Sequence, residues 1–315
     1  MALHSSGDTW PHLIENVLPG AIQHTLILMA GVAIIALVTG TGTAWLVTMY
    51  RFPGRGLFQW LLLLPLAMPT YIIAFCYIEL FDYSGEIQTA LRNIFGWQSA
   101  REYWFPDIRS LGGAIFVMGA VLYPYVYITA RASFVAQSVC VIEASRTLGR
   151  SASETFWQIA LPLARPALAA GTALALMETL NDIGAVEFFG VQTLTVTVYD
   201  TWLDRGSLAG AAQISCVMLF FVLAVLGLER ALRSGRRFHH TTGKYRDLPE
   251  ESLSGAKGIL ATAACALPIL IGFILPTYVM ARNAMAHLPS GLTEDFWRAA
   301  LHSLGLSVAA AVLGV

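Results

Sequence analysis

The chain has 315 residues, of which 56% are hydrophobic and only 12% are charged. Soluble domains carry about 25% charged residues, so this composition excludes a single soluble domain and predicts a membrane protein. The formal net charge of −1 indicates no nucleic-acid partner. The four cysteines form no C-x-x-C pair, which is typical of small core residues and predicts neither a disulfide nor a metal site.

The first two apolar runs predict two membrane spans joined by a tight basic turn. Residues 1–23 lack Lys and Arg and have no apolar stretch behind a basic one, so we do not expect them to form a signal peptide. Residues 24–49 are long enough to span, since about 20 apolar residues cross the hydrocarbon. After the turn at 51–56, residues 57–81 return with Pro65 and Pro69 inside the run. Two prolines predict a kinked helix, which suits either a pathway lining or a plain packing kink.

A polar loop at 82–110 separates this run from a third predicted span at 111–134. The loop contains Tyr103, Trp104 and Phe105, aromatic residues of the kind that gather at membrane interfaces. We therefore expect the loop to lie where the membrane meets water.

Residues 139–166, which we call the island, form a charged and only partly apolar segment between two long apolar runs. The pattern predicts a helix, a bend and a second helix. Gly149 is placed to end the first helix in a left-handed cap, and Ser151 with Glu154 forms a capping box that begins the second. Pro162 and Pro166 are expected to close the island before the next span. The alternative is an amphipathic connector that lies on the membrane surface.

The fourth predicted span, 166–189, carries polar residues that are unusual inside a membrane. They are Glu178, Asn181, Asp182 and Glu187, which we call the pathway residues. Positions 178, 181 and 182 share one helical face, and an acidic residue in mid-span should face other helices or water. Carboxylates suit a hard cation. Hydrogen bonding between helices, or a protonated carboxyl, is the interpretation that we favour, because a pathway that chelated a cation tightly would fail to release it.

Three more predicted spans complete the chain, at 208–228, at 256–280 and from 296 onward, and a basic loop at 229–255 precedes the sixth. Alternating sides through the seven spans places thirteen Lys and Arg residues on the side of the island and five on the other. By the positive-inside rule the island is cytoplasmic and the amino terminus faces outward.

A weak internal repeat divides the chain. His302-Ser303-Leu304 opens the seventh run as His24-Thr25-Leu26 opens the first, at an offset of 278 residues. We expect a first transmembrane repeat at 1–255 and the start of a second at 256–315.

The island resembles the EAA signature of ABC importer permeases, E-A-A-x3-G-x9-I-x-L-P. Every spacing agrees, and the one departure is a serine in place of the second alanine. The residues that match are Glu143, Ala144, Ser145, Gly149, Ile159, Leu161 and Pro162. Further segments look like the iron(III) branch of binding-protein-dependent permeases, among them RFPGRGLFQWLLLLPLAMPTY, from 51 to 71, and LMETLNDIGAVEFFGVQTLT, from 176 to 195.

This resemblance implies an all-α, polytopic bundle in a bacterial inner membrane that imports ferric iron by alternating access. It implies that the seven EAA residues belong to a coupling site, with Val139, Ile142 and Leu148 as its apolar face. Its expected partners are ABC ATPase subunits, an extracytoplasmic solute-binding protein, a second permease half and the lipid bilayer. The chain has no G-x4-G-K-[ST] phosphate loop, so we expect a partner to hydrolyse ATP. We expect no cofactor and no resident metal.

Other functions stay open at this point. Permeases for thiamine, phosphonate, polyamines or sulfate share the EAA signature. A secondary transporter would also carry repeats and buried carboxylates, but it would not need the island. A membrane-embedded enzyme would need a motif such as H-E-x-x-H or G-x-S-x-G, and the chain has neither.

Overall fold

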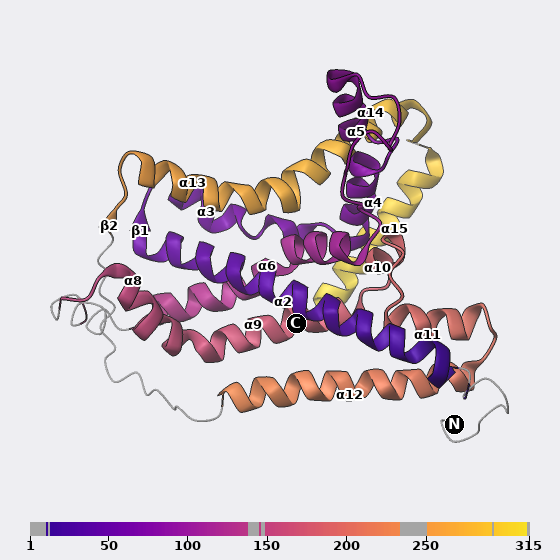
Figure 1. Ribbon diagram of the computed structural model, residues 1–315, viewed down its shortest axis with the longest axis horizontal. Coiled ribbons are helices and arrows are strands. Elements are labelled where there is room, and N and C mark those ends of the chain that lie inside the picture. Colours follow the sequence, from indigo (N-terminus) through magenta and orange to yellow (C-terminus); the bar gives the residue numbers. More distant parts are fainter. Residues whose placement is uncertain are drawn as a thin grey trace.

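A computed structural model describes residues 11, 13–137, 145, 149–233, 251–291 and 293–313. Within them the chain is helical, apart from two strands of two residues each (Figure 1). Turns η1, η3 and η4 are π-helical and η2 is a 3-10 turn. The elements are η1 (Leu13–Val17), α2 (Leu18–Met49), β1 (Tyr50–Arg51), α3 (Arg55–Leu61), η2 (Leu64–Ala67), α4 (Thr70–Phe81), α5 (Glu86–Phe95), α6 (Leu111–Ala136), α8 (Ala152–Thr155), η3 (Phe156–Ala160), α9 (Leu161–Asn181), α10 (Gly184–Phe188), α11 (Leu194–Leu203), α12 (Leu208–Arg233), β2 (Glu251–Ser252), α13 (Ala256–Ile269), η4 (Leu270–Ile274), α14 (Leu275–Gly291) and α15 (Glu294–Leu313).

Within the described part of the chain, six helices are long and apolar enough to cross a membrane, and a bent pair brings the number to seven. The pair comprises Arg55–Ala67 and Thr70–Phe95, which meet at 90°. The break falls at the predicted prolines, because Pro65 lies in the 3-10 turn η2 and Pro69 is the N-cap of α4. The predicted all-α bundle of about seven spans is therefore confirmed, and the expected kink in the second run is a complete break.

The predicted bounds of the first and fourth spans differ most from the structure. The first span begins at Leu13 and not at residue 24, because Pro19 fits the first turn of α2 and Ala21 and Thr25 are buried in the bundle. The fourth span ends at Asn181, since Asp182 leaves the helix and α10 follows as a separate short helix. The apolar residues after Asp182 belong to the packing of α10 against α4 and not to a continued span.

Helices α2, α6 and α9 form the centre of the bundle and lie side by side in Figure 1. Glycines allow their backbones to approach. A Cβ atom on Gly40 would lie 2.8 Å from the carbonyl oxygen of Tyr123, and one on Gly171 would lie 2.2 Å from Thr129 Oγ1. Tyr123 and Tyr127 are fully buried, and their hydroxyls donate to the carbonyls of Leu62 and Gln59, each at 3.0 Å. These bonds tie α6 to the broken second span.

One end of the bundle collects segments that are distant in sequence. Strands β1 and β2 pair in parallel, with Tyr50 opposite Glu251 and Arg51 opposite Ser252. Leu253 N donates to Arg51 O at 2.8 Å, and α8 lies at the same end (Figure 1). We call this the island end. The turn after α2, the described second part of the island and the segment before α13 thus share one end, as the predicted sidedness requires. The basic residues at 234–250 lie outside the described residues.

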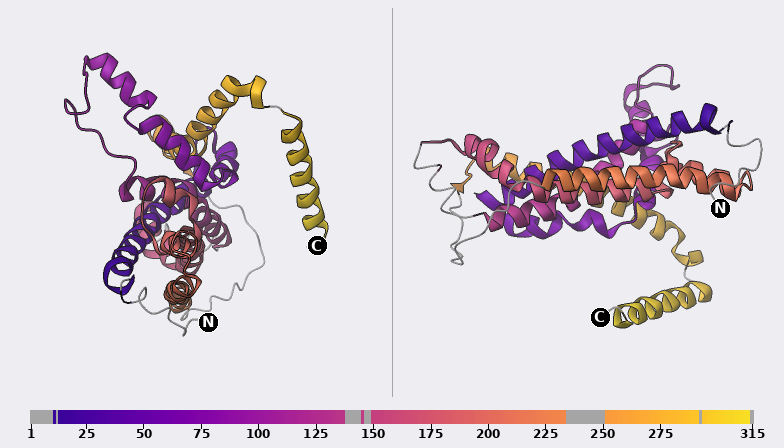
Figure 2. Two further views of the ribbon diagram at one scale, coloured as in Figure 1. Left: turned by 90° about the vertical axis from the view of Figure 1, so that its right-hand side faces the viewer. Right: turned by 90° about the horizontal axis from the view of Figure 1, so that it is seen from below.

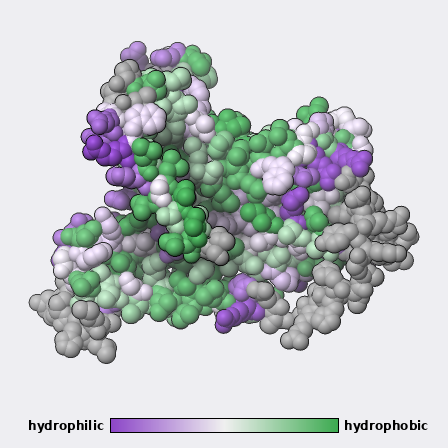
Figure 3. Space-filling view, turned by 180° about the vertical axis from the view of Figure 1, so that it is seen from behind, coloured by the Kyte–Doolittle hydropathy of each residue, from purple (hydrophilic) through white to green (hydrophobic). Residues whose placement is uncertain are grey.

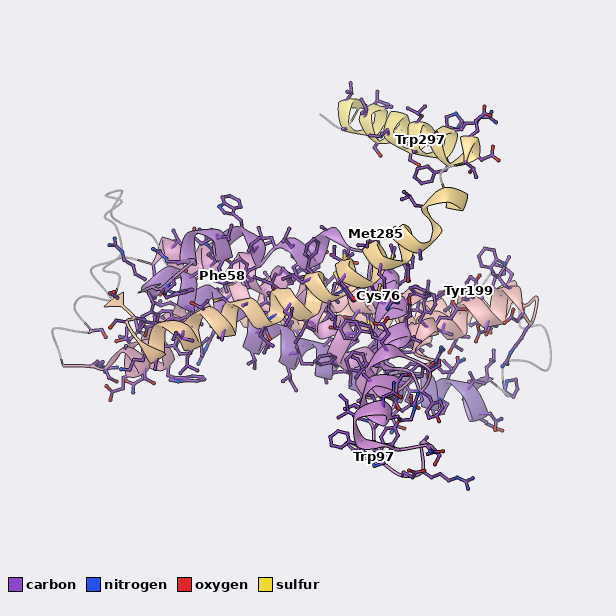
Figure 4. The ribbon with its side chains drawn as sticks, turned by 90° about the horizontal axis from the view of Figure 1, so that it is seen from above. Phe58, Cys76, Trp97, Tyr199, Met285 and Trp297 are labelled. Atoms are coloured by element: carbon purple, nitrogen blue, oxygen red, sulfur yellow. The ribbon has the colours of Figure 1, made fainter. Side chains whose placement is uncertain are left out.

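At the opposite part of the molecule, α5 and the loop to α6 form a projecting cap. Phe95, Trp97 and Tyr103 stack with ring centroids 4.7 and 4.8 Å apart, and Figure 4 shows Trp97 at the far tip. Arg282 of α14 forms ion pairs with Glu79 and Glu86. The cap is therefore tied to the helix that begins the predicted second repeat.

Helix α15 stands away from the rest of the chain (Figure 2), and none of its residues is buried. It carries His302-Ser303-Leu304, which resembles His24-Thr25-Leu26 inside α2. Much of the face seen in Figure 3 is hydrophobic, and hydrophilic residues gather in patches toward its margins. This surface suits contact with hydrocarbon or with other apolar helices.

Candidate functional site

The bend of the island has the predicted geometry. Gly149 has a φ of 81°, in the left-handed region that favours glycine. Arg150 N donates to Ser145 O at 3.2 Å, which is the six-to-one bond of a Schellman motif with Gly149 at its C′ position. Glu143 and Ala144 lie outside the described residues, as do Val139, Ile142 and Leu148, so the predicted coupling face has no structural description.

The capping box after the bend is also confirmed. Ser151 Oγ accepts from Glu154 N at 3.3 Å, and Glu154 Oε2 accepts from Ser151 N at 2.8 Å. The expected end at Pro162 is wrong, because α8, η3 and α9 run on as one helical segment, Ala152–Asn181. The π-turn η3 changes the hydrogen-bond register directly before Pro162, so the ring and the missing N–H are tolerated there. Pro166 lies inside α9.

The second part of the island is anchored to the bundle by contacts that sequence reasoning missed. The ring centroid of Phe156 lies 4.9 Å from that of Trp45 in α2, and the Trp45 centroid lies 5.3 Å from that of Phe134 in α6. Gln137 Nε2, just after α6, donates to Ala160 O at 2.9 Å. These partners are far apart in sequence, and no local spacing points to them. These contacts fasten η3 to α2 and α6.

The remaining predicted coupling residues lie in this anchored part. Ile159, Leu161 and Pro162 are half-buried, as expected for residues that pack on the bundle. The exposed side chains are different ones, chiefly Trp157, which is 63% exposed.

Ser145, the departure from the EAA signature, is 3% exposed and contacts the second part of the island directly. Its hydroxyl lies 2.6 Å from the hydroxyl of Thr155, which is 1% exposed. The two residues flank the bend, so this hydrogen bond closes it from the inside. The serine in place of alanine was the only sign of this contact in the sequence, and it did not show that Thr155 is the partner.

The pathway residues lie at the end of α9 and not in mid-span. Glu178 is one turn from the last helical residue, Asn181, and both are exposed. Asp182 has left the helix, and its Oδ1 accepts from Ala185 N in the first turn of α10 at 2.8 Å. The predicted common face therefore holds for 178 and 181 only. Glu187 lies on α10 and is exposed.

Glu178 has one partner from a neighbouring helix. Tyr125 of α6 donates its hydroxyl to Glu178 Oε1 at 3.3 Å. This is the helix-to-helix hydrogen bond that we favoured from the sequence. Among the described residues, no group of three or more His, Cys, Asp or Glu side chains is arranged to hold a metal ion.

Comparison with known proteins places this chain among transport permeases. Residues 36–238 match the family described as binding-protein-dependent transport system inner membrane component. The Fe(3+)-transport system permease protein FbpB 2 of Haemophilus influenzae is 26% identical over 220 residues, which cover 70% of this chain and 39% of that protein. The sulfate transport system permease protein CysT of Synechococcus elongatus is 29% identical over 234 residues, covering 72% of this chain and 81% of the relative.

Two further comparisons agree with this result, one in sequence and one in fold. A putative molybdenum transport system permease protein of Bacillus subtilis, YvgM, is 29% identical over 221 residues, covering 66% of this chain and 92% of the relative. A crystal structure of a bacterial alginate ABC transporter, in complex with an alginate pentasaccharide-bound periplasmic protein, contains a chain that superimposes with a TM-score of 0.60 at 14% identity. The superposition covers 74% of this chain and 85% of that one, and it supports the fold alone.

Proposed function

The chain belongs to the family of binding-protein-dependent transport system inner membrane components, and on that premise we propose that it carries ferric iron into the cell. It is a multi-pass inner-membrane permease subunit of an ABC importer, in which ATP hydrolysis belongs to a separate subunit. The family match over residues 36–238 is the observation that carries this function. The substrate, the partners and the residue roles below are our proposal.

In the proposed cycle, an extracytoplasmic solute-binding protein delivers iron to the outer end of the bundle. Two ABC ATPase subunits on the cytoplasmic side close on ATP and move the island as a rigid body. A second permease half, fused or separate, completes the pathway. The contacts of Phe156 and Gln137 with α2 and α6 support this step, because they make the island and the central helices move together.

The island is the proposed joint to the ATPase. Glu143, Ala144 and Gly149 form the part that enters a groove of that subunit, and Ser145 lies behind the bend. Ile159, Leu161 and Pro162 hold the joint to the membrane-spanning part, in keeping with their half-buried positions. The exposed and well-formed glycine bend supports this assignment.

The pathway residues favour a cation over an oxyanion. Glu178, Asp182 and Glu187 carry three carboxylates within one short segment at the end of α9. Fixed negative charges attract cations and repel sulfate or molybdate. Carboxylate oxygens also suit a hard cation such as ferric ion. Because these carboxylates are spread over a helix end, the residue that follows it and α10, they would attract iron without chelating it tightly.

Oxyanion transport is the second candidate function. Sulfate and molybdenum permeases match this chain at 29% identity over most of their own length. That is as strong a similarity as the one with the Fe(3+) permease, at 26%. The charges at the end of α9 are the observation that weighs against the oxyanions.

Uptake by a deletion strain separates the two candidates. Labelled ferric iron, sulfate and molybdate are each measured in cells that lack the gene and in cells that carry it on a plasmid. We expect iron uptake to fall in the deletion strain and to return with the plasmid, while both oxyanions enter normally. Normal iron uptake beside lost sulfate or molybdate uptake would assign the protein to an oxyanion importer.

A further inference from the structure

We propose that the hydroxyl pair of Ser145 and Thr155 is a positioning contact that sets the angle between the two parts of the island. Through that angle it would fix how much solute moves for each ATP hydrolysed. This inference rests on the proposed role of the island as the joint to the ATPase. It concerns two buried residues that position the joint and that need not touch the ATPase.

The pair has the geometry of a strong and shielded hydrogen bond. The oxygens are 2.6 Å apart, and the two residues are 3% and 1% exposed. Water cannot replace either partner at such a site, so loss of one hydroxyl leaves the other without its partner in a dry environment. An exposed pair would exchange freely with solvent and would not hold an angle.

Ser145 is held at two points, and this fixes its orientation as well as its position. Its carbonyl accepts from Arg150 N at 3.2 Å across the bend, and its hydroxyl meets Thr155. Gly149 permits the first bond through its left-handed backbone but does not determine the angle of the two parts by itself. The EAA signature has alanine at this position, and alanine has no hydroxyl. A chain with the alanine of the signature would lack this second point of attachment.

Thr155 lies on the part of the island that is fixed to the bundle. It follows the capping box of Ser151 and Glu154 and directly precedes Phe156, whose ring packs on Trp45 of α2. A force on the segment around Ser145 thus passes through Thr155 to Phe156 and on to α2. Weakening the hydroxyl pair would let the first part of the island tilt without moving α2.

A purely stabilising role would change folding and leave coupling untouched, so the decisive readout is the number of ATP molecules hydrolysed per solute transported. The complete transporter, with its ATPase and binding protein, is reconstituted in liposomes. Thr155→Val removes the hydroxyl and keeps the shape of the side chain, whereas Thr155→Ser keeps the hydroxyl. Ser145→Ala restores the residue of the EAA signature. Thr43→Val is the matched control, because Thr43 is also buried but its hydroxyl bonds within its own helix, to Thr39 O at 2.7 Å.

We expect Thr155→Val and Ser145→Ala each to raise the ATP consumed per solute by about fivefold, the equilibrium factor that corresponds to one typical hydrogen bond. Thr155→Ser and Thr43→Val should stay close to wild type, and the double variant Ser145→Ala/Thr155→Val should be no worse than either single one. A wild-type ratio in Ser145→Ala and Thr155→Val overturns the proposal. Thr155→Ser as uncoupled as Thr155→Val, or an equal rise in Thr43→Val, overturns it too.

Gly149→Val, measured beside these variants, separates this proposal from the function of the island. If Gly149→Val abolishes transport while Thr155→Val is normal, the joint is real and only the positioning contact is refuted. If Gly149→Val also transports normally, the island is not the joint, and both proposals are lost.

Discussion

Replacing Gly149 by valine strains the bend of the island without creating a clash. The backbone φ is 81°, and nothing lies within 4 Å of the position that a Cβ atom would take. The effect is therefore conformational: a residue with a Cβ atom costs about 1 to 2 kcal/mol in the left-handed region, and β-branching adds to this. A cost of that size lowers the population of the correct bend by roughly 5- to 30-fold.

The assay is copurification of the ATPase together with solute-stimulated ATP hydrolysis, each normalised to the amount of permease in the membrane. We expect Gly149→Val to insert normally and to lose most of both signals, and Gly149→Asn to keep more, since asparagine tolerates this conformation. Gly96→Val is the matched control, because Gly96 has a φ of 74° and equally open surroundings but lies in the cap. Equal losses in Gly149→Val and Gly96→Val, or none in Gly149→Val, would refute the reasoning.

Three further changes test other parts of the molecule. Glu143→Arg puts a positive charge near the positive end of the first predicted helix, so normal membrane levels with lost ATPase association are expected in a pull-down; retained association would contradict a coupling role. Glu178→Gln should lower labelled iron uptake by about fivefold, because two unit charges 4 Å apart in water attract each other by about 1 kcal/mol. The control is Asp204→Asn on the surface, which should leave iron uptake unchanged. Gly171→Ala should destabilise the permease by about 1 to 3 kcal/mol in thermal unfolding in detergent, since its Cβ would lie 2.2 Å from Thr129 Oγ1. Gly42→Ala is the control, because the space around Gly42 is open and the stability should not change. Equal unfolding temperatures for the two variants would contradict the packing argument.

The spans could be predicted from the sequence because each needs only a long apolar run, which can be recognised from consecutive residues alone. The direction of the chain after Pro65 and Pro69 could not. Tyr77 donates its hydroxyl to Ile271 O at 2.9 Å, so the helix after the break is placed by a partner nearly two hundred residues away. The spacing of apolar residues along the sequence cannot predict such a bond.

The same division holds within the candidate sites. Gly149 and the Ser151 capping box were predictable because their bonds close within a few residues. The pair of Ser145 and Thr155 lies across the bend, where helical spacing no longer applies. Asp182 was misplaced because the sequence stays largely apolar beyond it. The helix end is seen in the extended backbone of Asp182 and in its bond to Ala185 N.

The pairing of β1 with β2 bears on the order in which the chain assembles. The strands lie about 200 residues apart, so at roughly 5 to 20 residues per second β1 leaves the ribosome about 10 to 40 seconds before β2. Two-residue strands are too short to persist alone. The helices from α2 to α12 must therefore insert and pack before β1 can pair with β2. When β2 arrives, the pairing holds the start of α13 beside the turn after α2 and so sets where the next apolar helix enters the bilayer.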